Sequence, residues 1–255
     1  WNYTNFLYRP RRPEELDTRL GGGIIFNQVP HQVDTIRLLA GGMAKSVKAV
    51  TGIWDKERPT EGSYLAYLDF EGGAAASMVY NGYDHFDTDE FHYWIGENGE
   101  NKVGSALTST GTPAGSHGRL RTALGEVKTA EDEKALRLMA GWGGERAPGR
   151  HDSSTSNEPH FGITIVSCEQ GDMRPSENGV FLFTKDGKNE VPIDGSRTAG
   201  RGEVLDELYN AVIHNEPLIH DARWGKATLE VCLGILRSSR EGKEIALSHQ
   251  VPDVR

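Results

Sequence analysis

Short segments rich in β-branched and aromatic residues follow one another along this chain, with helical segments before and after them. The strand-like segments are residues 46–54, 63–70, 75–80, 91–95, 162–168 and 180–184. Their apolar residues alternate with polar ones or form short runs, as they do in strands. Glycine-containing turns at residues 71–73 and 185–187 suit hairpins. The pattern therefore predicts a mainly antiparallel sheet.

Helical periodicity marks further stretches, which are residues 30–40, 203–214 and 222–240. Gly242 is placed to cap the last of these helices. Helices on both sides of a run of antiparallel strands predict an α+β fold, a large open sheet with its helices on one face. Residues 98–159 are rich in small and polar residues, with one helix expected at residues 130–140. We interpret them as a loop-rich excursion within a single domain, residues 1–255.

Composition and charge limit the kinds of molecule that this chain is expected to bind. The formal net charge of −9 argues against a nucleic-acid surface, because such surfaces gather Lys and Arg against phosphate. A small-molecule partner is favoured instead. No apolar run approaches the roughly twenty residues of a membrane helix, and residues 1–8 do not resemble a signal peptide. Cys168 and Cys232 lie in apolar stretches, so we expect buried free thiols in a cytoplasmic protein.

A dinucleotide-binding domain opens with a strand, a G-x-G-x-x-G turn and a helix, and no such arrangement occurs in this sequence. The run Gly21-Gly22-Gly23 does not have that spacing. Walker-type, H-E-x-x-H and paired C-x-x-C motifs do not occur either. Because the chain also begins at Trp1 and not at Met, we expect a truncated chain whose N-terminal dinucleotide-binding half is missing.

The segment from residue 21 to residue 42 carries the strongest candidate for chemistry. Pro30 suits the first helical position. The apolar stripe of the helix is formed by Val29, Val33, Ile36 and Ala40. His31, Asp34 and Thr35 then lie together on the opposite face. His31 therefore faces water, a partner or a cleft, and from spacing alone a catalytic residue and an exposed surface histidine are equally open.

Two features favour the catalytic role. His31 lies in the first turn of the helix, where the positive end of the helix dipole favours neutral imidazole, the form that accepts a proton. Asn27, four residues earlier, is placed to hydrogen-bond the imidazole or a substrate hydroxyl. An Asn at this position also serves as a simple turn residue, so both roles stay open for it.

The spacing of the glycine run, Asn27, His31 and Asp34 resembles the signature of the glucose-fructose oxidoreductase, inositol dehydrogenase and MocA (Gfo/Idh/MocA) family. That signature has GGG, then an Asp, a His four residues later and an Asp three residues beyond it, at the start of a C-terminal domain. The order of elements that follows, a helix, a large open sheet and two terminal helices, is similar as well. The resemblance thus extends over essentially the whole chain.

Within this family, several segments look closest to the dehydrogenases of phthalate dihydrodiols, the dihydroxyphthalate dehydrogenases. These segments are residues 8–16, 31–42, 167–180 and 220–232. The resemblance implies an oxidoreductase of aromatic catabolism that uses NAD or NADP to oxidise a hydroxyl of a small cyclic diol, such as a phthalate cis-dihydrodiol. One alternative is a sugar or polyol dehydrogenase of the same family. The other, if the chain is complete, is a non-catalytic binding or assembly module.

The family's roles can be placed on this sequence residue by residue. His31 would be the general acid/base for the substrate hydroxyl, and Asn27 stands where the family has its companion Asp. Because Asn cannot ionise, only hydrogen bonding is left at that position. The family's catalytic Lys and most of the NAD(P) site would belong to the missing half. Asp34 would either orient His31 or make hydrogen bonds within the helix. Relatives form dimers or tetramers, so a homo-oligomer is expected.

Other candidates concern substrate binding. Arg9 and Arg11, next to Tyr8, would bind an anionic substrate, because guanidinium forks match carboxylates; a charged surface linker is the alternative. His92 would contribute if its strand lines a cleft. The acidic, histidine-bearing residues 84–92 follow no known ligand spacing, so we expect a solvated connection there and no metal site.

Overall fold

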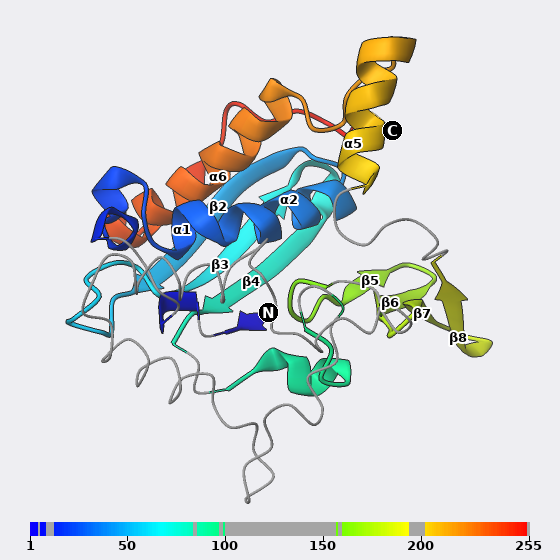
Figure 1. The fold of residues 1–255 in the computed structure, drawn as a ribbon, viewed down its shortest axis with the longest axis horizontal. Coiled ribbons are helices and arrows are strands. Elements are labelled where there is room, and N and C mark those ends of the chain that lie inside the picture. Colours follow the sequence, from blue (N-terminus) through cyan, green and yellow to red (C-terminus); the bar gives the residue numbers. More distant parts are fainter. Residues whose placement is uncertain are drawn as a thin grey trace, which may run out of the picture. The chain divides into compact units, whose positions relative to one another are not determined.

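The computed structural model describes residues 1–4, 6–8, 13–83, 86–96, 99, 157, 160–193 and 202–253 (Figure 1). The chain divides into two compact units. The helix–sheet unit is Thr4–Tyr83 and Pro217–Arg255, and the small-sheet unit is Trp1–Tyr3 and Asp84–Glu216. The predicted excursion at residues 98–159, with its helix, lies outside the described residues except at two positions.

In the helix–sheet unit, strands β4, β3, β2 and β9 lie side by side in that order and pair antiparallel. Their bounds are β2 (Ala44–Gly52), β3 (Ser63–Phe70), β4 (Ala75–Asn81) and β9 (Ile245–Ala246). The predicted hairpin turn is present as η4 (Glu71–Gly73). Gly72 and Gly73 have φ of 85° and 91° there, which explains why the turn needs glycine. The strands predicted at residues 46–54, 63–70 and 75–80 are thereby confirmed, the first of them shifted by two residues.

Strand β3 shows why this sheet has one covered face. Tyr64, Ala66 and Leu68 are buried, whereas Leu65 and Tyr67 between them are 58% and 50% exposed. Successive side chains of a strand point to opposite faces. The covering helices are α1 (Ile24–Asn27), α2 (Val29–Leu39) and α6 (Ala222–Glu241), and Figure 1 shows them on the same side of the sheet. The predicted α+β arrangement, with helices on one sheet face, is confirmed in this unit.

Helix α6 also protects the edge of strand β2. Strand β9 pairs with β2 only at Ser46 and Val47, so the later N–H groups on that edge need other acceptors. Ser238 Oγ accepts a hydrogen bond from the N–H of Ala49 at 2.8 Å. Ser239 Oγ accepts one from the next outward-facing N–H, that of Thr51, at 2.9 Å. The helix therefore satisfies backbone groups that a longer partner strand would otherwise pair.

The caps of α6 explain where this helix begins and ends. Asp221 is its N-cap, and the side chain accepts a hydrogen bond from Trp224 N at 2.8 Å. Gly242 follows the last turn with φ of 67° and donates its N–H to Ser238 O. A left-handed residue at this position favours glycine. The predicted glycine cap is confirmed.

Arg37 of α2 is fully buried and connects three segments of the helix–sheet unit. Its nitrogens donate to Gly42 O (3.3 Å), Gln250 Oε1 (2.9 Å), Trp224 O (3.1 Å), Thr228 Oγ1 (2.9 Å) and Val251 O (3.4 Å). Its Cζ also lies 3.9 Å from the centroid of the Trp224 ring. Burial lowers the pKa of Arg37, and the carboxylates of Asp34 and Glu230 oppose this effect. One cation thus holds α2 against α6 and the C-terminal segment.

The small-sheet unit has its own antiparallel sheet, in the order β5, β6, β7, β8. Its strands are β5 (Val166–Cys168), β6 (Gly171–Pro175), β7 (Gly179–Thr184) and β8 (Gly187–Pro192). Its other elements are β1 (Asn2–Tyr3), the 3-10 helix η5 (Thr88–His92), α5 (Gly202–Tyr209) and the π-helical η6 (Asn210–His214). The predicted turn at residues 185–187 does join two strands, and the helix predicted at residues 203–214 is divided between α5 and η6.

The predicted strand at residues 91–95 is wrong, because η5 ends within this segment. Asp87 caps η5, and its Oδ1 accepts a hydrogen bond from Asp89 N at 3.0 Å. Tyr93 and Trp94 follow with φ of 57° and 59°. Two successive left-handed residues cannot continue a strand. The strand predicted at residues 162–168 is confirmed only for its last three residues, as β5.

The sequence predicted that both cysteines are buried, and this prediction is confirmed for only one of them. Cys232 on α6 is buried, and burial raises the pKa of its thiol to about 12. Cys168 is exposed, so the prediction that it is buried is wrong; it lies on β5, an edge strand of the small sheet. Both are free thiols. Among the described helices, none has both the length and the apolar character to cross a bilayer.

Replacing Arg37 by Met should lower the free energy of unfolding by about 3 kcal/mol. Met fills most of the same space, but the carbonyl oxygens around the guanidinium lose their donors in a buried site. Urea unfolding of the two proteins measures the difference. The matched control is Arg240→Met at an exposed position of α6, which should stay within about 0.5 kcal/mol of the parent. Equal losses in both variants would contradict the role given to Arg37.

Candidate functional site

The glycine run forms a tight turn between η3 (Thr18–Leu20) and α1. Gly23 has φ of 77°, and a Cβ at this position would overlap the hydroxyl of Thr60. A Cβ on Gly22 would overlap the backbone carbonyl of Glu15, which also accepts a hydrogen bond from Gly23 N at 2.7 Å. Protein atoms therefore fill the space beside Gly22 and Gly23, and the turn fixes where α1 begins.

Asn27 is the last residue of α1, and Gln28 joins it directly to α2. The Nδ2 group of Asn27 donates a hydrogen bond to Gly23 O at 3.0 Å. This bond holds the amide against the glycine turn. Among the described residues, no donor reaches Asn27 Oδ1, so this oxygen can accept a hydrogen bond from a ligand. The observed partner of Asn27 is thus the backbone of the turn, and neither an imidazole nor a neighbouring side chain.

His31 lies in the first turn of α2 and is exposed, as the helical periodicity predicted. Its backbone N–H donates to Gln28 O at 3.2 Å, and its carbonyl accepts a hydrogen bond from Thr35 Oγ1 at 3.0 Å. Pro30 occupies the same turn and restricts its backbone. The imidazole is therefore presented at the surface from a well-fixed helix start.

Asp34, one turn further along α2, is held by residues of α6. Its Oδ1 accepts hydrogen bonds from Trp224 Nε1 and, at 3.3 Å, from Thr228 Oγ1. Its Oδ2 lies 3.5 Å from His220 Nε2, in the segment before α6. These partners differ from both expectations, a contact with His31 and a hydrogen bond within α2. Asp34 and His31 share one helix, but the carboxylate is directed to α6.

Sequence reasoning missed two polar residues on the covered face of α2. One is Arg37, which shares Thr228 with Asp34: the threonine hydroxyl accepts from Arg37 Nη1 and donates to Asp34 Oδ1. The other is Gln32, 6% exposed, which accepts a hydrogen bond from Tyr64 OH at 2.7 Å and donates to Val79 O at 3.2 Å. The apolar stripe gives no sign of them, because it is read from apolar residues alone.

The predicted arginine site cannot be located in the described part of the chain. Arg9 and Arg11 lie outside the described residues, and Tyr8 is described only as the end of the 3-10 helix η1 (Phe6–Tyr8). The site therefore stays a prediction.

His92 belongs to the small-sheet unit, where it ends η5 and is only 4% exposed. Its ring centroid lies 4.0 Å from that of His160. Its Nε2 is buried and has no hydrogen-bond partner among the described residues. Burial, and then the neighbouring His160 and Arg174, lower the pKa of His92 to about 4. His92 is therefore an uncharged imidazole at neutral pH.

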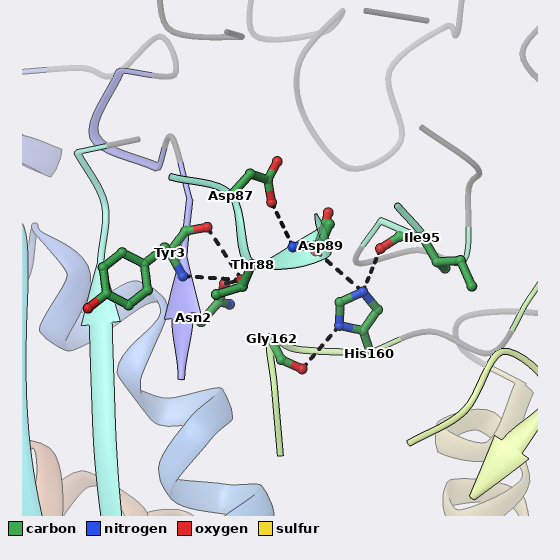
Figure 2. Close-up of polar contacts among 8 residues, drawn as sticks. All are labelled: Asn2, Tyr3, Asp87, Thr88, Asp89, Ile95, His160 and Gly162. Carbon is green, nitrogen blue, oxygen red and sulfur yellow. Dashed lines mark hydrogen bonds and ion pairs between the residues drawn. The ribbon is translucent and has the colours of Figure 1, made fainter. Parts of the chain in front are cut away.

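His160 is the buried centre of the polar contacts in Figure 2. Its Nε2 lies 2.6 Å from Ile95 O and 3.4 Å from Asp89 Oδ1, and its Nδ1 lies 3.2 Å from Gly162 O. These contacts join η5 and the residues after it to the segment that leads into β5. Across the described residues, no three His, Cys, Asp or Glu side chains are grouped so as to hold a metal ion.

Fold and site together define a class of domain, an α+β unit in which a glycine turn leads into a helix that presents an exposed histidine. Residues 1–100 match the family described as GFO/IDH/MocA C-terminal domain. The family resemblance of the motif is thereby confirmed for this part of the chain.

Two relatives share more than a third of their aligned residues with this chain. One relative is the 1-carboxy-3-chloro-3,4-dihydroxycyclo hexa-1,5-diene dehydrogenase of Comamonas testosteroni, which is 37% identical to this chain over 239 residues. The alignment covers 94% of this chain and 57% of that protein. A crystal structure from Bordetella bronchiseptica RB50, provisionally named as a dehydrogenase, is 45% identical with a TM-score of 0.82 and covers 96% of this chain and 60% of that one. The chain thus spans less than two thirds of the length of these relatives.

A more distant structure shares the fold. The WlbA dehydrogenase from Bordetella pertussis, solved in complex with NADH and UDP-GlcNAcA, is 18% identical with a TM-score of 0.51. The similarity covers 93% of this chain and 52% of that one. At this identity the comparison supports the architecture alone.

We expect the small-sheet unit to lose stability as the pH falls from about 6.5 to about 4. In the unfolded chain His92 takes up a proton near its ordinary pKa of 6.5, whereas in the folded chain its pKa is about 4. The unfolded state binds more protons across this window, so the free energy of unfolding decreases as the pH falls through it. At about 1.4 kcal/mol for each pKa unit, the loss is at most about 3.5 kcal/mol.

Urea unfolding at pH 7 and pH 4.5, for the parent and for His92→Gln, measures this effect. Glutamine does not titrate, so the variant should lose less stability than the parent between the two pH values. The control is His249→Gln, which replaces an exposed histidine and should follow the parent. An identical pH dependence in the parent and His92→Gln would contradict the assignment.

Proposed function

We propose that this chain is the substrate-binding part of an NAD(P)-dependent dehydrogenase that oxidises a hydroxyl of a small cyclic diol, with a phthalate cis-dihydrodiol as substrate. The observation that carries the proposal is the position of His31, exposed in the first turn of α2 directly after the glycine turn and Asn27. The name of the Comamonas relative describes a carboxylated dihydroxycyclohexadiene as the compound that protein acts on. A carboxylated cyclic diol is therefore the substrate class we favour over a neutral sugar or polyol.

In this proposal His31 is the general base that takes the proton of the reacting hydroxyl, and it returns a proton in the reverse direction. Asn27 Oδ1 accepts a hydrogen bond from the neighbouring hydroxyl of the diol. Because Asn27 Nδ2 is held by Gly23 O, this acceptor is fixed in orientation before the substrate binds. Asn27 therefore orients the diol without taking part in proton transfer.

The residues of the glycine turn do not fit a dinucleotide. A pyrophosphate needs open backbone N–H groups at a helix start, but Glu15 and Thr60 occupy the space beside Gly22 and Gly23. In our proposal NAD or NADP is held by a separate dinucleotide-binding domain of the full-length protein, and the residues of this chain bind substrate and move its proton.

We also infer that the full-length protein is a homo-oligomer that uses the outer face of the larger sheet. Val50, Leu65 and Tyr67 are 62%, 58% and 50% exposed on this face. Val50 and Leu65 are cross-strand partners, so their side chains form one continuous apolar surface. Apolar surface of this kind is typical of a subunit interface. The free thiols at both cysteines are consistent with a cytoplasmic protein.

Removing the proposed base tests the assignment of His31. In the full-length protein, His31→Ala should lower kcat on the phthalate dihydrodiol by about a hundredfold to ten-thousandfold, with little change in the affinity for the cofactor. His249→Ala, which removes another exposed histidine, should keep the parent's kcat. Near-normal turnover of His31→Ala at several pH values would make His31 a surface histidine, and the dehydrogenase proposal would then need another base.

The proposal that the substrate is anionic is tested by substituting Arg9 and Arg11. A chain of net charge −9 repels a dicarboxylate unless it has a local cationic site, and both arginines precede the glycine turn. Arg9→Lys and Arg11→Lys keep the charge but lose the bidentate fork. We expect each change to lower kcat/KM on the phthalate dihydrodiol by about tenfold relative to a neutral dihydrodiol.

Arg19→Lys is the control for this experiment, because Arg19 already pairs with Asp17 at 2.6 Å. It should leave the ratio of the two substrates unchanged. If Arg9→Lys and Arg11→Lys also leave that ratio unchanged, these arginines do not bind the carboxylates. If the parent prefers a neutral sugar to both diols, the protein is a sugar or polyol dehydrogenase.

A further inference from the structure

Arg174, on strand β6 of the small-sheet unit, is a half-buried cation whose hydrogen bonds are weak. Its Nη2 donates to Tyr93 OH at 3.3 Å, and its Nη1 donates to the carbonyl of the adjacent Pro175 at 3.4 Å. No carboxylate among the described residues pairs with it. Because a guanidinium carries five N–H donors, most of its hydrogen-bonding capacity is unused within the described chain.

A second cation lies over the same aromatic ring. The ring centroid of Phe181 is 5.1 Å from Arg174 Cζ and 3.5 Å from Lys188 Nζ. Arg174 pairs with Phe181 across β6 and β7, and Lys188 pairs with Phe183 across β7 and β8, so all four side chains belong to one face of the sheet. Because both cations approach this ring, their positive charges favour an anion at this face of the sheet.

The chain's own carboxylates do not supply this anion within the described residues. Asp172 and Glu190 share the sheet face by strand alternation, but neither is within 4 Å of Arg174 or Lys188. Cations elsewhere in the described chain do pair with carboxylates. Examples are Arg19 with Asp17, Lys45 with Asp69, Arg223 with Asp221, and Arg237 and Lys243 with Glu241. Arg174 and Lys188 have no such partner among the described residues, so both are available to an anionic ligand.

The surroundings of Arg174 are suited to binding a flat ring as well as a negatively charged group. Tyr93 is 40% exposed, and its ring centroid lies 5.9 Å from Arg174 Cζ. Phe181 is half-buried beside it. His92, which precedes Tyr93, has a buried Nε2 without a partner among the described residues. Aromatic faces next to a guanidinium fork offer stacking to a flat ring and paired donors to its carboxylate.

We propose that Arg174 and Lys188, with Tyr93 and Phe181, form a binding site for a carboxylate attached to a flat ring. Arg174 donates two parallel N–H groups to the carboxylate, and Lys188 adds a point charge. The choice of ligand rests on the proposed function, since a carboxylated cyclic diol and its aromatic product both carry this group. The site itself rests only on residues of the small-sheet unit.

Calorimetry with phthalate as the probe, on the purified protein without cofactor, tests the site. Phthalate should bind, and Arg174→Gln should weaken binding at least about tenfold, because a charge-assisted bidentate contact is lost. Arg174→Lys should restore only part of the affinity, and Lys188→Gln should cause a smaller loss. The control is Lys185→Gln, at an exposed turn position two residues beyond Phe183, which should bind phthalate as the parent does.

Competing ligands and further variants distinguish this site from a general anion site and from the predicted arginine site. Benzamide, which is neutral, should not compete with phthalate, and inorganic phosphate should bind at least about tenfold more weakly; equal binding of phosphate would overturn the assignment to a ring carboxylate. The proposed site would be overturned if phthalate binding is lost in the double variant Arg9→Gln/Arg11→Gln but kept in Arg174→Gln. Binding does not need turnover, so a full-length protein that has no dehydrogenase activity but still binds phthalate through Arg174 would refute the proposed dehydrogenase and leave this site standing.

Discussion

The arrangement of the helix–sheet unit depends on how a fully buried guanidinium is satisfied. Arg37 is fully buried, so its N–H groups need acceptors away from bulk solvent. These acceptors come from Gly42 after α2, the first turns of α6 and residues 250–251. An incompletely paired buried cation is costly. The two helices and the C-terminal segment therefore fit together in one way, and the position of α2 follows from it.

The packing of α2 against α6 through Arg37 also holds the candidate catalytic residues in position. Asp34 is fixed by Trp224 and Thr228, and Thr228 also accepts from Arg37, so one side of α2 is anchored along its length. The glycine turn fixes the other end, before α1. His31 lies on the remaining, exposed side of a helix that has little freedom to move. A general base needs this kind of fixed position relative to its substrate.

Apolar periodicity predicted the fold class, most helices and the larger sheet because burial of apolar side chains determines them. It could not predict Arg37 or the partners of Asp34, since a charged residue in a helix normally faces water and Trp224 is distant in the sequence. It also assigned residues 91–95 to a strand, where the side chain of Asp87 and two left-handed residues form η5. Strand β8 was missed because all of its residues are exposed. For the candidate site, the exposed position of His31 on α2 was predicted, and the contacts of Asn27 and Asp34 were not.

The buried histidine pair constrains how the small-sheet unit can attract an anion. His92 was a candidate for substrate binding, and its pKa of about 4 means that it brings no positive charge at neutral pH. In our proposal the charge comes from Arg174 and Lys188. Because the charge of Arg174 is one of the causes that lower the pKa of His92, an anion bound to Arg174 would weaken that effect. Burial is the larger cause, so His92 would stay neutral near pH 7 and act, if it acts on a ligand, through its uncharged ring nitrogens.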